Sequence, residues 1–338
     1  MPLNKNRRIV LAARPEGEPR DTDFRFEVGD VPVLREGEVL LRTIYLSLDP
    51  YMRGRMDARP SDAQPIGIGE VMVGATVSEV VASKSPDFNS GDIVLSYSGW
   101  QEYAVSDTKH LQRLNPEIAP VTTALGVLGM PGMTAYTGLL NIGQPKEGDT
   151  LVVAAAAGAV GSVVGQIARI KGCRAVGIAG GESKCAHVRE QLGFDDCVDH
   201  RSSSFSAELR EACPNGIDIY FENVGGRIFD VVLGMLNPFA RVPVCGLIAL
   251  YNAIEFAPRQ GWAERLMATV LTKRLTLRGF IVSDFLPQSG DFFRDMVLWL
   301  REGKVHYRED VVDGLENAVG AFQRLLHGQN FGKLLVRF

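Results

Sequence analysis

The chain has 338 residues, a formal net charge of −4 and 46% hydrophobic residues. This length suggests about two globular domains. The slightly acidic charge argues against a nucleic-acid-binding surface, and no apolar run reaches the ~18 residues that a membrane span requires. The first residues carry charges without a following apolar core, so no secretion signal is expected. The five cysteines lie in the second half without any CxxC pair, which predicts reduced thiols and a cytoplasmic protein.

Residues 1–125 are predicted to form a β-rich domain, either a barrel or a sandwich. Turn clusters separate β-branched or alternating runs, and the expected strands cover residues 8–13, 38–44, 70–81, 93–97 and 101–105. Between these runs, residues 46–53 do not resemble a strand. Residues 122–140 favour a helix that breaks at Pro131, and the small-residue block 129–139 is predicted to join two domains.

After residue 149, runs of strand length alternate with segments of helical spacing. The expected strands cover residues 150–155, 175–179, 197–198, 217–221, 240–245 and 275–279, and the expected helices lie between and after them. This alternation predicts an α/β fold, a doubly wound parallel Rossmann sheet of six strands. A helix over 316–326 and a strand over 333–338 are predicted to return to the first domain. We therefore expect one domain from residues 1–129 and 305–338, and a second from residues 130–304.

A turn of small residues joins the strand at 150–155 to the helix that follows it. Ala155, Gly158 and Gly161 form the pattern AxxGxxG, a variant of the dinucleotide fingerprint. Small residues at these positions let a pyrophosphate reach backbone N–H groups at the start of a helix. An ordinary α/β turn is the alternative, but the flanking strands favour a dinucleotide site.

The residues after the second strand indicate which dinucleotide is bound. An NAD site usually places an acidic residue there, about 20 residues past the glycines. Here the strand ends in Gly180-Gly181 without a carboxylate, Lys184 follows, and Arg201 closes the next strand. Two cations without an acid fit the 2′-phosphate of NADP(H), although both could be solvated surface charges. Glu182 also lies here and could serve the helix N-terminus.

Several longer motifs, in order along essentially the whole chain, resemble one family. They are LDPYMRGRM, GMPGMTAY, AAAAGAVGSVVGQIAR with GGESK, YFENVGG, CGLIALYN and the terminal NFGKLLVRF. The chain resembles the zinc-independent medium-chain dehydrogenases/reductases of the leukotriene/prostaglandin reductase and alkenal double-bond reductase kind. The opening NRRIVLAARPEGEP is similar to the bacterial curcumin-reductase branch.

This resemblance implies a GroES-like β-barrel catalytic domain, a Rossmann domain that binds NADP(H), and usually a homodimer. It also implies reduction of a carbon–carbon double bond conjugated to a carbonyl in a small-molecule substrate. The cofactor-binding residues that it implies are Met130, Ala157, Gly158, Ala159, Val160, Gly161, Gly180, Lys184, His200, Arg201, Asn223, Cys245, Leu247, Tyr251, Phe280, Val282 and Asn330. His200 and Arg201 stand where the family often has Tyr before Lys, which is a departure on the adenine side.

The motifs of the zinc-dependent relatives are absent. These relatives carry GHExxG, whereas residues 69–74 have Glu70 in place of the histidine. They also carry a cysteine three residues before an aspartate, whereas Leu46 precedes Asp49. We therefore expect no metal, and without a Lewis acid plain alcohol oxidation is harder to support.

Metal-free hydride addition to an alkene needs a conjugated carbonyl to accept the electrons as an enolate. The protein must then stabilise the oxyanion and deliver a proton, and a tyrosine hydroxyl suits both tasks. Tyr251 and Tyr51 are the candidate catalytic residues, with packing in a loop or turn as the alternative for each. A ribose hydroxyl or water could also donate the proton. Arg53 could bind an anionic substrate group, but a salt bridge within its turn is favoured.

The predicted function is NADPH-dependent reduction of α,β-unsaturated ketones and aldehydes. The same scaffold also supports an NADPH:quinone oxidoreductase, which is the first alternative. A non-catalytic NADPH-binding protein is the second, because one fold can carry many functions. The tyrosines and the glycine turn favour an enzyme over this second alternative.

Overall fold

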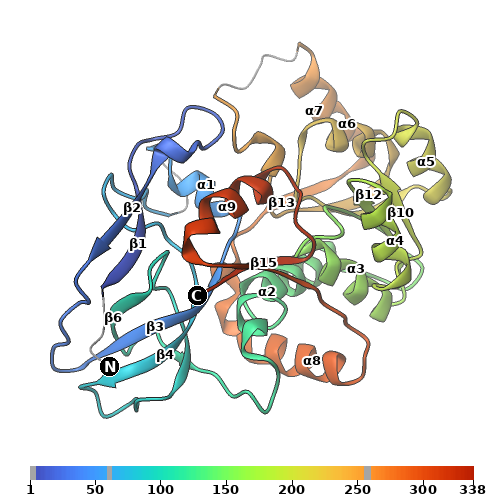
Figure 1. Ribbon diagram of the computed structural model, residues 1–338. Helices are drawn as coiled ribbons and strands as arrows, with labels where there is room; N and C mark the ends of the chain where they lie inside the picture. The colour runs from blue at the N-terminus through green and yellow to red at the C-terminus, as the bar shows by residue number, and fades with distance from the viewer. Residues whose placement is uncertain (1–4, 59–62, 255–259) are drawn as a thin grey trace. The chain divides into compact units, whose positions relative to one another are not determined.

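A computed structural model describes residues 5–58, 63–254 and 260–338 (Figure 1). The chain forms two compact units, which we call the first unit (Met1–Gly129 with Glu309–Phe338) and the second unit (Met130–Arg308). The first unit is therefore built from both ends of the chain, and the second unit is one continuous segment. Among the described residues, no helix has both the length and the hydropathy that a membrane crossing requires.

The second unit contains a parallel sheet of six strands in the order β10-β9-β8-β11-β12-β13. These strands are β8 (Thr150–Ala154), β9 (Arg174–Ala179), β10 (Asp196–Asp199), β11 (Ile217–Phe221), β12 (Leu236–Val244) and β13 (Thr276–Gly279). The strand order reverses between the neighbours β8 and β11, which makes their carboxyl ends a topological switch point. The predicted α/β fold with a doubly wound Rossmann sheet is confirmed.

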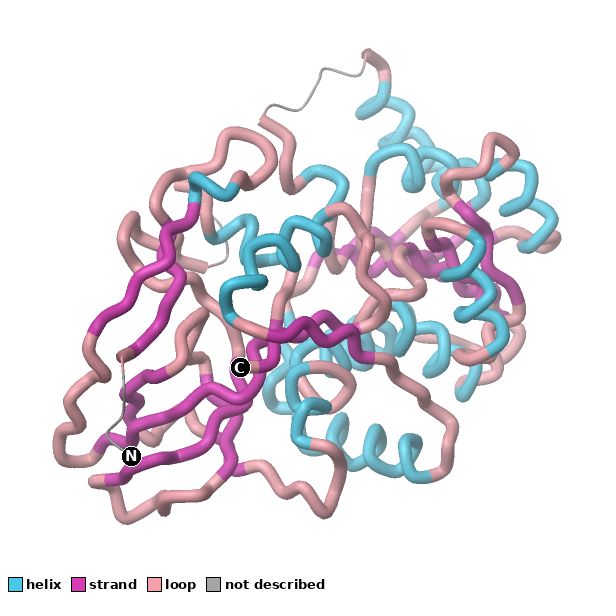
Figure 2. The backbone as a smooth tube through the Cα atoms, viewed as in Figure 1, coloured by secondary structure: helices cyan, strands magenta, loops and turns pink. Residues whose placement is uncertain are grey.

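Helices lie on both sides of these strands in the second unit (Figure 2). They are α2 (Met130–Thr137), α3 (Gly161–Ile170), α4 (Glu182–Glu190), α5 (Phe205–Ala212), α6 (Gly226–Met235), α7 (Trp262–Lys273) and α8 (Ser289–Arg301). Phe205 of α5 and Val232 of α6 pack with Val152 and Val176 of the strands, and all four are fully buried. Each such side chain contributes roughly 1.5–3 kcal/mol by burial, so the core holds the strand ends in place.

The helix expected over residues 122–140 is confirmed in part: residues 130–143 are helical, as α2 and then a π-helix (Gly138–Gly143), but the break lies before Met130 and not at Pro131. The chain instead forms a 3-10 helix (Val121–Leu125), and α2 begins only at Met130, with Pro131 in its first turn. Proline is tolerated there because the first helical N–H groups have no intrahelical partner. A side chain on Gly129 would place its Cβ 1.9 Å from the Ala124 carbonyl oxygen, so this tight turn requires glycine.

The first unit contains a mixed sheet in the order β14-β15-β3-β4-β5-β7, with β6 on β3, and a hairpin β1-β2. Its elements are β1 (Asn6–Leu11), β2 (Phe24–Gly29), β3 (Glu38–Ser47), α1 (Tyr51–Arg55), β4 (Thr76–Ser83), β5 (Ile93–Ser96), β6 (Tyr103–Asp107), β7 (Gln112–Arg113), β14 (Glu309–Asp313), α9 (Ala318–Leu326) and β15 (Lys333–Arg337). The strand expected over 70–81 is shorter, because only an isolated bridge at Val71 precedes β4. β2 and β14 were not predicted. β14 is a charged pentapeptide that gains its structure by pairing with β15.

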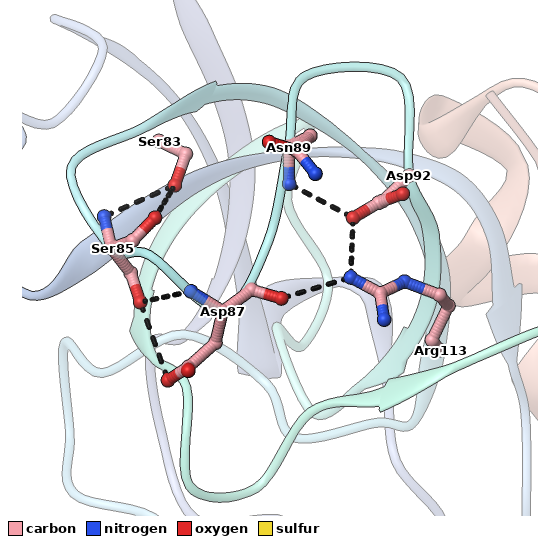
Figure 3. A network of polar contacts seen from close by, with 6 residues as sticks. All are labelled: Ser83, Ser85, Asp87, Asn89, Asp92 and Arg113. Carbon is pink, nitrogen blue, oxygen red and sulfur yellow. Dashed lines mark hydrogen bonds and ion pairs between the residues drawn. The ribbon is translucent and has the colours of Figure 1, made fainter.

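A surface network in the first unit closes the turn between β4 and β5 (Figure 3). Arg113 of β7 donates to the carbonyl oxygen of Asp87 and to the Asp92 carboxylate, both at 2.8 Å. Asp92 also accepts a hydrogen bond from the backbone N–H of Asn89 at 2.9 Å, and Ser83 and Ser85 bond each other. These bonds lower the pKa of Asp92, with Arg113 as the main cause. The network therefore holds the turn between β4 and β5 in place. The charges of Arg113 and Asp92 are paired with each other inside it.

Candidate functional site

The turn between β8 and α3 has a backbone that excludes larger residues. Ala155 adopts φ +54, the left-handed region, and its carbonyl oxygen points back under the start of α3. A Cβ on Gly161 would lie 2.4 Å from that oxygen, and one on Gly158 would lie 3.2 Å from it. The first contact is closer than real Cβ atoms approach, so Gly161 is a steric requirement of the turn.

The start of α3 offers backbone N–H groups to a ligand. From Ser162 onward the N–H groups are used within the chain, since Ser162 N–H bonds the Gly158 carbonyl and Val164 N–H bonds that of Val160, both at 3.0 Å, so the groups that a ligand can reach are those before Ser162 in the turn. Val160 precedes the helix and supplies no side-chain cap. The positive end of α3 therefore suits a phosphate oxygen. The predicted residues Ala157, Gly158, Ala159, Val160 and Gly161 all belong to this turn.

A second group of predicted residues meets at the ends of β9 and β10. Asp199 ends β10, and its carboxylate accepts the backbone N–H groups of Gly181 and Arg201, both at 2.9 Å. Burial would raise the pKa of Asp199, but these hydrogen bonds outweigh it and the net shift is downward. A Cβ on Gly180 would lie 3.0 Å from His200 Nε2 and 3.1 Å from Arg201 Nε. Asp199 therefore organises this corner, although the sequence analysis did not single it out.

The charges at this corner are suited to an anion. Lys184 lies in the first turn of α4 and is half-buried, and its backbone N–H bonds the Gly181 carbonyl at 3.1 Å. Burial and the neighbouring Arg201 lower the pKa of His200, which is then a neutral hydrogen-bonding group at pH 7. Glu182 pairs with Arg189 of the same helix. The negative charge of Glu182 is thus balanced by Arg189 along α4, which leaves the corner suited to an anion.

A third group of predicted residues lies beyond β11 and β12. Asn223 Nδ2 donates to the Ala154 carbonyl at 2.9 Å, which ties the end of β11 to the end of β8. The backbone N–H of Cys245 donates to the Glu222 carbonyl at 2.9 Å. Burial, with Glu222 as a second cause, raises the pKa of the Cys245 thiol to about 12, so the thiol is neutral. The Tyr251 hydroxyl lies 3.5 Å from Leu247 N, so its ring folds back over this loop.

The remaining predicted residues of the second unit lie around α2 and β13. Met130 opens α2, and its carbonyl accepts the Thr134 hydroxyl at 2.8 Å. Phe280 follows β13 and is only 8% exposed, with its ring edge-on to Phe221 at a centroid distance of 6.2 Å. Val282 begins the 3-10 helix Val282–Gln288 and is half-buried. Phe280 therefore packs mainly as a core residue, whereas Val282 keeps some exposed surface.

In the first unit, Tyr51 is the first residue of α1 and is 38% exposed. Burial, followed by the nearby Asp49 carboxylate, raises the pKa of Tyr51, so the hydroxyl keeps its proton at neutral pH. Arg53 pairs with Asp57 at 2.7 Å and donates to the Gly17 carbonyl at 2.8 Å. The favoured salt bridge of Arg53 within its turn is confirmed. Asn330 Nδ2 donates to the Gly332 carbonyl at 2.9 Å.

A buried ion pair that the sequence did not predict holds the chain just before Tyr51. Lys333 Nζ lies 3.1 Å from the Asp49 carboxylate, and the two side chains are 4% and 7% exposed. The same ammonium donates to the Leu48 carbonyl at 2.7 Å. Burial lowers the pKa of Lys333 in spite of Asp49. Lys333 is visible in the NFGK motif, but only the folded chain identifies its partner.

The described residues contain no group of three or more His, Cys, Asp or Glu side chains able to hold a metal ion. Glu70, which replaces the histidine of the zinc motif, accepts the backbone N–H of Gly67 at 2.7 Å. A Cβ on Gly67 would also collide with the Glu70 carboxyl group. Glu70 therefore serves a tight turn.

The chain is similar to known proteins along almost its whole length. Residues 7–114 match the family described as N-terminal domain of oxidoreductase, and residues 159–300 match the family described as zinc-binding dehydrogenase. The chain is 57% identical to the NADPH-dependent curcumin reductase of Escherichia coli (strain K12), over 98% of this chain and 97% of that protein. It is 42% identical to prostaglandin reductase 1 of Oryctolagus cuniculus, over 94% and 89% of the two chains.

Solved structures extend this likeness to the fold. The crystal structure of CurA in complex with NADPH from Vibrio vulnificus matches with a TM-score of 0.94 and 55% identity, covering 98% of each chain. A 2-alkenal reductase (NADP(+)-dependent) of Nicotiana tabacum is 37% identical, over 98% of this chain and 97% of that protein. These matches extend over the sequence of both units of the chain.

Proposed function

Because this chain belongs to the zinc-independent medium-chain dehydrogenase/reductase family, we propose that it is an NADPH-dependent reductase of α,β-unsaturated ketones and aldehydes. Its similarity to curcumin, prostaglandin and 2-alkenal reductases supports reduction of the conjugated carbon–carbon double bond. The observation that carries the proposal is the dinucleotide turn, where Gly161 has no room for a side chain against the Ala155 carbonyl. The chain is then an oxidoreductase whose cofactor is NADP(H).

The residues of the second unit fit this cofactor. The glycine turn and the uncapped start of α3 suit the pyrophosphate. Lys184 and Arg201 would hold the 2′-phosphate, with Gly180 and His200 beside them. Met130, Asn223, Cys245, Leu247, Tyr251, Phe280 and Val282 are the further contacts proposed in this unit, and Asn330 of the first unit is one more. When bound, NADPH supplies the hydride that adds to the β-carbon of the substrate.

In this proposal a tyrosine hydroxyl stabilises the enolate and donates the proton. As the β-carbon gains the hydride, charge develops on the substrate carbonyl oxygen and an enolate forms. A tyrosine hydroxyl that donates a hydrogen bond to this oxygen stabilises the charge, and proton transfer to the α-carbon completes the reduction. Tyr51 suits this role because it is exposed at the start of α1 and its hydroxyl carries a proton at neutral pH. Tyr251 suits it because its hydroxyl lies on the loop that carries Cys245 and Leu247.

The function is tested by NADPH oxidation with a medium-chain 2-alkenal, an aryl enone such as a curcuminoid, a simple quinone and a saturated aldehyde. Product analysis identifies the reduced bond. We expect saturated ketones and aldehydes from the first two substrates and no turnover of the saturated aldehyde. Turnover of the quinone alone would replace the proposal with a quinone reductase. Tight NADPH binding without any turnover would make the chain a non-catalytic NADPH-binding protein.

Replacing Lys184 with alanine should raise the KM for NADPH about tenfold and leave the KM for NADH nearly unchanged. The expected cause is loss of a cation at the 2′-phosphate, which NADH lacks. Steady-state kinetics with both cofactors measure the difference, and Lys171→Ala, an exposed lysine beyond α3, is the matched control. Equal changes for NADPH and NADH would remove Lys184 from the 2′-phosphate site.

A homodimer and a cytoplasmic location are further parts of the proposal. β13 ends the sheet order of the second unit and leaves one strand edge unpaired within the described chain. Met267 and Leu271 on the neighbouring α7 are 65% and 76% exposed. An open edge with nearby apolar side chains supports pairing with a second copy. Light scattering should then give twice the chain mass of 36.9 kDa, and a monomer mass would exclude the dimer.

The five free cysteines support a cytoplasmic location, because the cytoplasm keeps thiols reduced. Cell fractionation tests this location.

A further inference from the structure

Glu222 follows β11 and is the acidic residue of the YFENVGG motif, and its side chain is almost completely buried at 2% exposure. Its Oε1 accepts the backbone N–H of Val224 at 2.6 Å and that of Gly225 at 2.8 Å. The Tyr220 hydroxyl donates to the same oxygen at 3.1 Å. One carboxyl oxygen therefore shapes the whole turn between β11 and α6.

The backbone of Glu222 holds a second loop. Its carbonyl oxygen accepts the N–H groups of Cys245 at 2.9 Å and Gly246 at 3.1 Å, and its own N–H donates to the Pro243 carbonyl at 3.0 Å. These bonds continue the pairing of β11 with β12 past the end of the sheet, where a parallel bridge joins Glu222 to Val244. Glu222 thus accepts hydrogen bonds from N–H groups of two loops, the one that follows β11 and the one that follows β12.

The same two loops carry residues proposed above as cofactor contacts. The proposed 2′-phosphate site lies at the ends of β9 and β10 and the pyrophosphate turn follows β8, so the nicotinamide end of the cofactor would extend over the next strands, β11 and β12. Asn223 lies inside the first loop, and its side chain reaches the Ala154 carbonyl at 2.9 Å. Cys245 and Leu247 lie in the second loop, where the Ile248 N–H reaches back to the Asn223 carbonyl at 3.3 Å. Glu222 therefore sets the spacing of the two loops together with the direct bond between Ile248 and Asn223.

We propose that Glu222 is a positioning residue for hydride transfer, which sets the two loops so that the nicotinamide end of NADPH is held in one orientation. This inference rests on the proposed function. Glu222 itself contacts neither substrate nor cofactor, because its carboxyl group lies beneath the loops. It acts through Asn223 and the Cys245–Leu247 backbone.

The second carboxyl oxygen of Glu222, Oε2, helps to choose the substitution that keeps the positioning role. Oε2 is buried and accepts no hydrogen bond from any described residue. Burial raises the pKa of Glu222, and the hydrogen bonds that its carboxyl group accepts oppose this shift. Glutamine has the shape of the glutamate side chain and keeps an acceptor for the Val224 and Gly225 N–H groups. Aspartate keeps the carboxyl group but is one methylene too short to reach them.

The test compares Glu222→Gln, Glu222→Asp and Glu222→Ala with the core variant Val232→Ala, a fully buried α6 residue of the same unit. The readouts are NADPH affinity by cofactor fluorescence, kcat with an enone, and the kinetic isotope effect with NADPH deuterated at the transferred position. We expect Glu222→Asp and Glu222→Ala to weaken NADPH binding about tenfold, to lower kcat and to raise the isotope effect. Glu222→Gln should stay within about threefold of the wild type in all three.

Val232→Ala controls for a structural effect alone. It should lower the thermal stability while leaving NADPH affinity and the isotope effect unchanged. If Glu222→Asp behaves like Val232→Ala in all readouts, the positioning role is wrong while the proposed function stands. If the wild type reduces no enone and Glu222→Asp still weakens NADPH binding, the proposed function and the role in hydride transfer both fail, and only a role in cofactor binding is left.

Discussion

Replacing Gly161 with alanine should weaken NADPH binding by about 100-fold or more, equivalent to about 2.7 kcal/mol. The added Cβ would lie 2.4 Å from the Ala155 carbonyl oxygen and 2.9 Å from its carbon. No rotamer relieves a collision with backbone, so the turn between β8 and α3 must move, and the N–H groups at the start of α3 move with it. Overpacking of this kind costs about 1–3 kcal/mol of folding stability. Fluorescence titration with NADPH and thermal unfolding measure the two effects.

Two other glycine-to-alanine changes separate binding from folding. Gly234 lies in α6 with nothing within 4 Å of its Cβ position, so Gly234→Ala should leave both stability and binding intact or slightly improved. A Cβ on Gly165 in α3 would collide with the Phe194 ring at 1.9 Å, away from the glycine turn. Gly165→Ala should therefore lower stability with a smaller loss of affinity. NADPH binding by Gly161→Ala at the wild-type level would remove this turn from the cofactor site.

Removing the hydroxyl group of the tyrosine that protonates the enolate should lower kcat about 10²–10⁴-fold. The variants are Tyr51→Phe and Tyr251→Phe, because each keeps its ring and loses only the acidic group. Burial and Asp49 raise the pKa of Tyr51, so its protonated form persists above the ordinary value of about 10. If Tyr51 is the donor, the wild-type rate should therefore not fall through loss of this proton between about pH 7 and 10.

The control for these variants is Tyr136→Phe. The Tyr136 hydroxyl donates to Asp295 at 2.8 Å inside the packing of α2 and α8. Its loss should cost about 1 kcal/mol of stability and leave kcat unchanged. Enone turnover is measured with saturating NADPH, so that binding defects do not enter. Wild-type kcat in both Tyr51→Phe and Tyr251→Phe would exclude tyrosine as the proton source and favour a ribose hydroxyl or water.

The sequence predicted those parts of the molecule that depend on local patterns. Helical spacing and short apolar runs identified the six strands of the second unit and the helices between them, because burial on a parallel sheet demands such runs. The small residues from Ala155 to Gly161 predicted a tight turn, and the structure adds the reason, a carbonyl oxygen against the Gly161 position. Family motifs extended this to the remaining site residues, whose roles stay predictions until the variants are measured.

Other features depend on partners that lie far away along the chain. Nothing around Lys333 indicates that its ammonium is buried on Asp49. Asp199 and Glu222 look like ordinary acidic residues until their backbone donors are seen. The helix start at Met130 and the strand β14 also depend on tertiary context, since a turn excludes a side chain at Gly129 and β15 supplies the pairing for β14. Periodicity and glycine spacing are local properties that a sequence displays directly. The partner of a buried charge or backbone group is decided only when distant segments pack, because leaving that group unpaired costs about 1–3 kcal/mol.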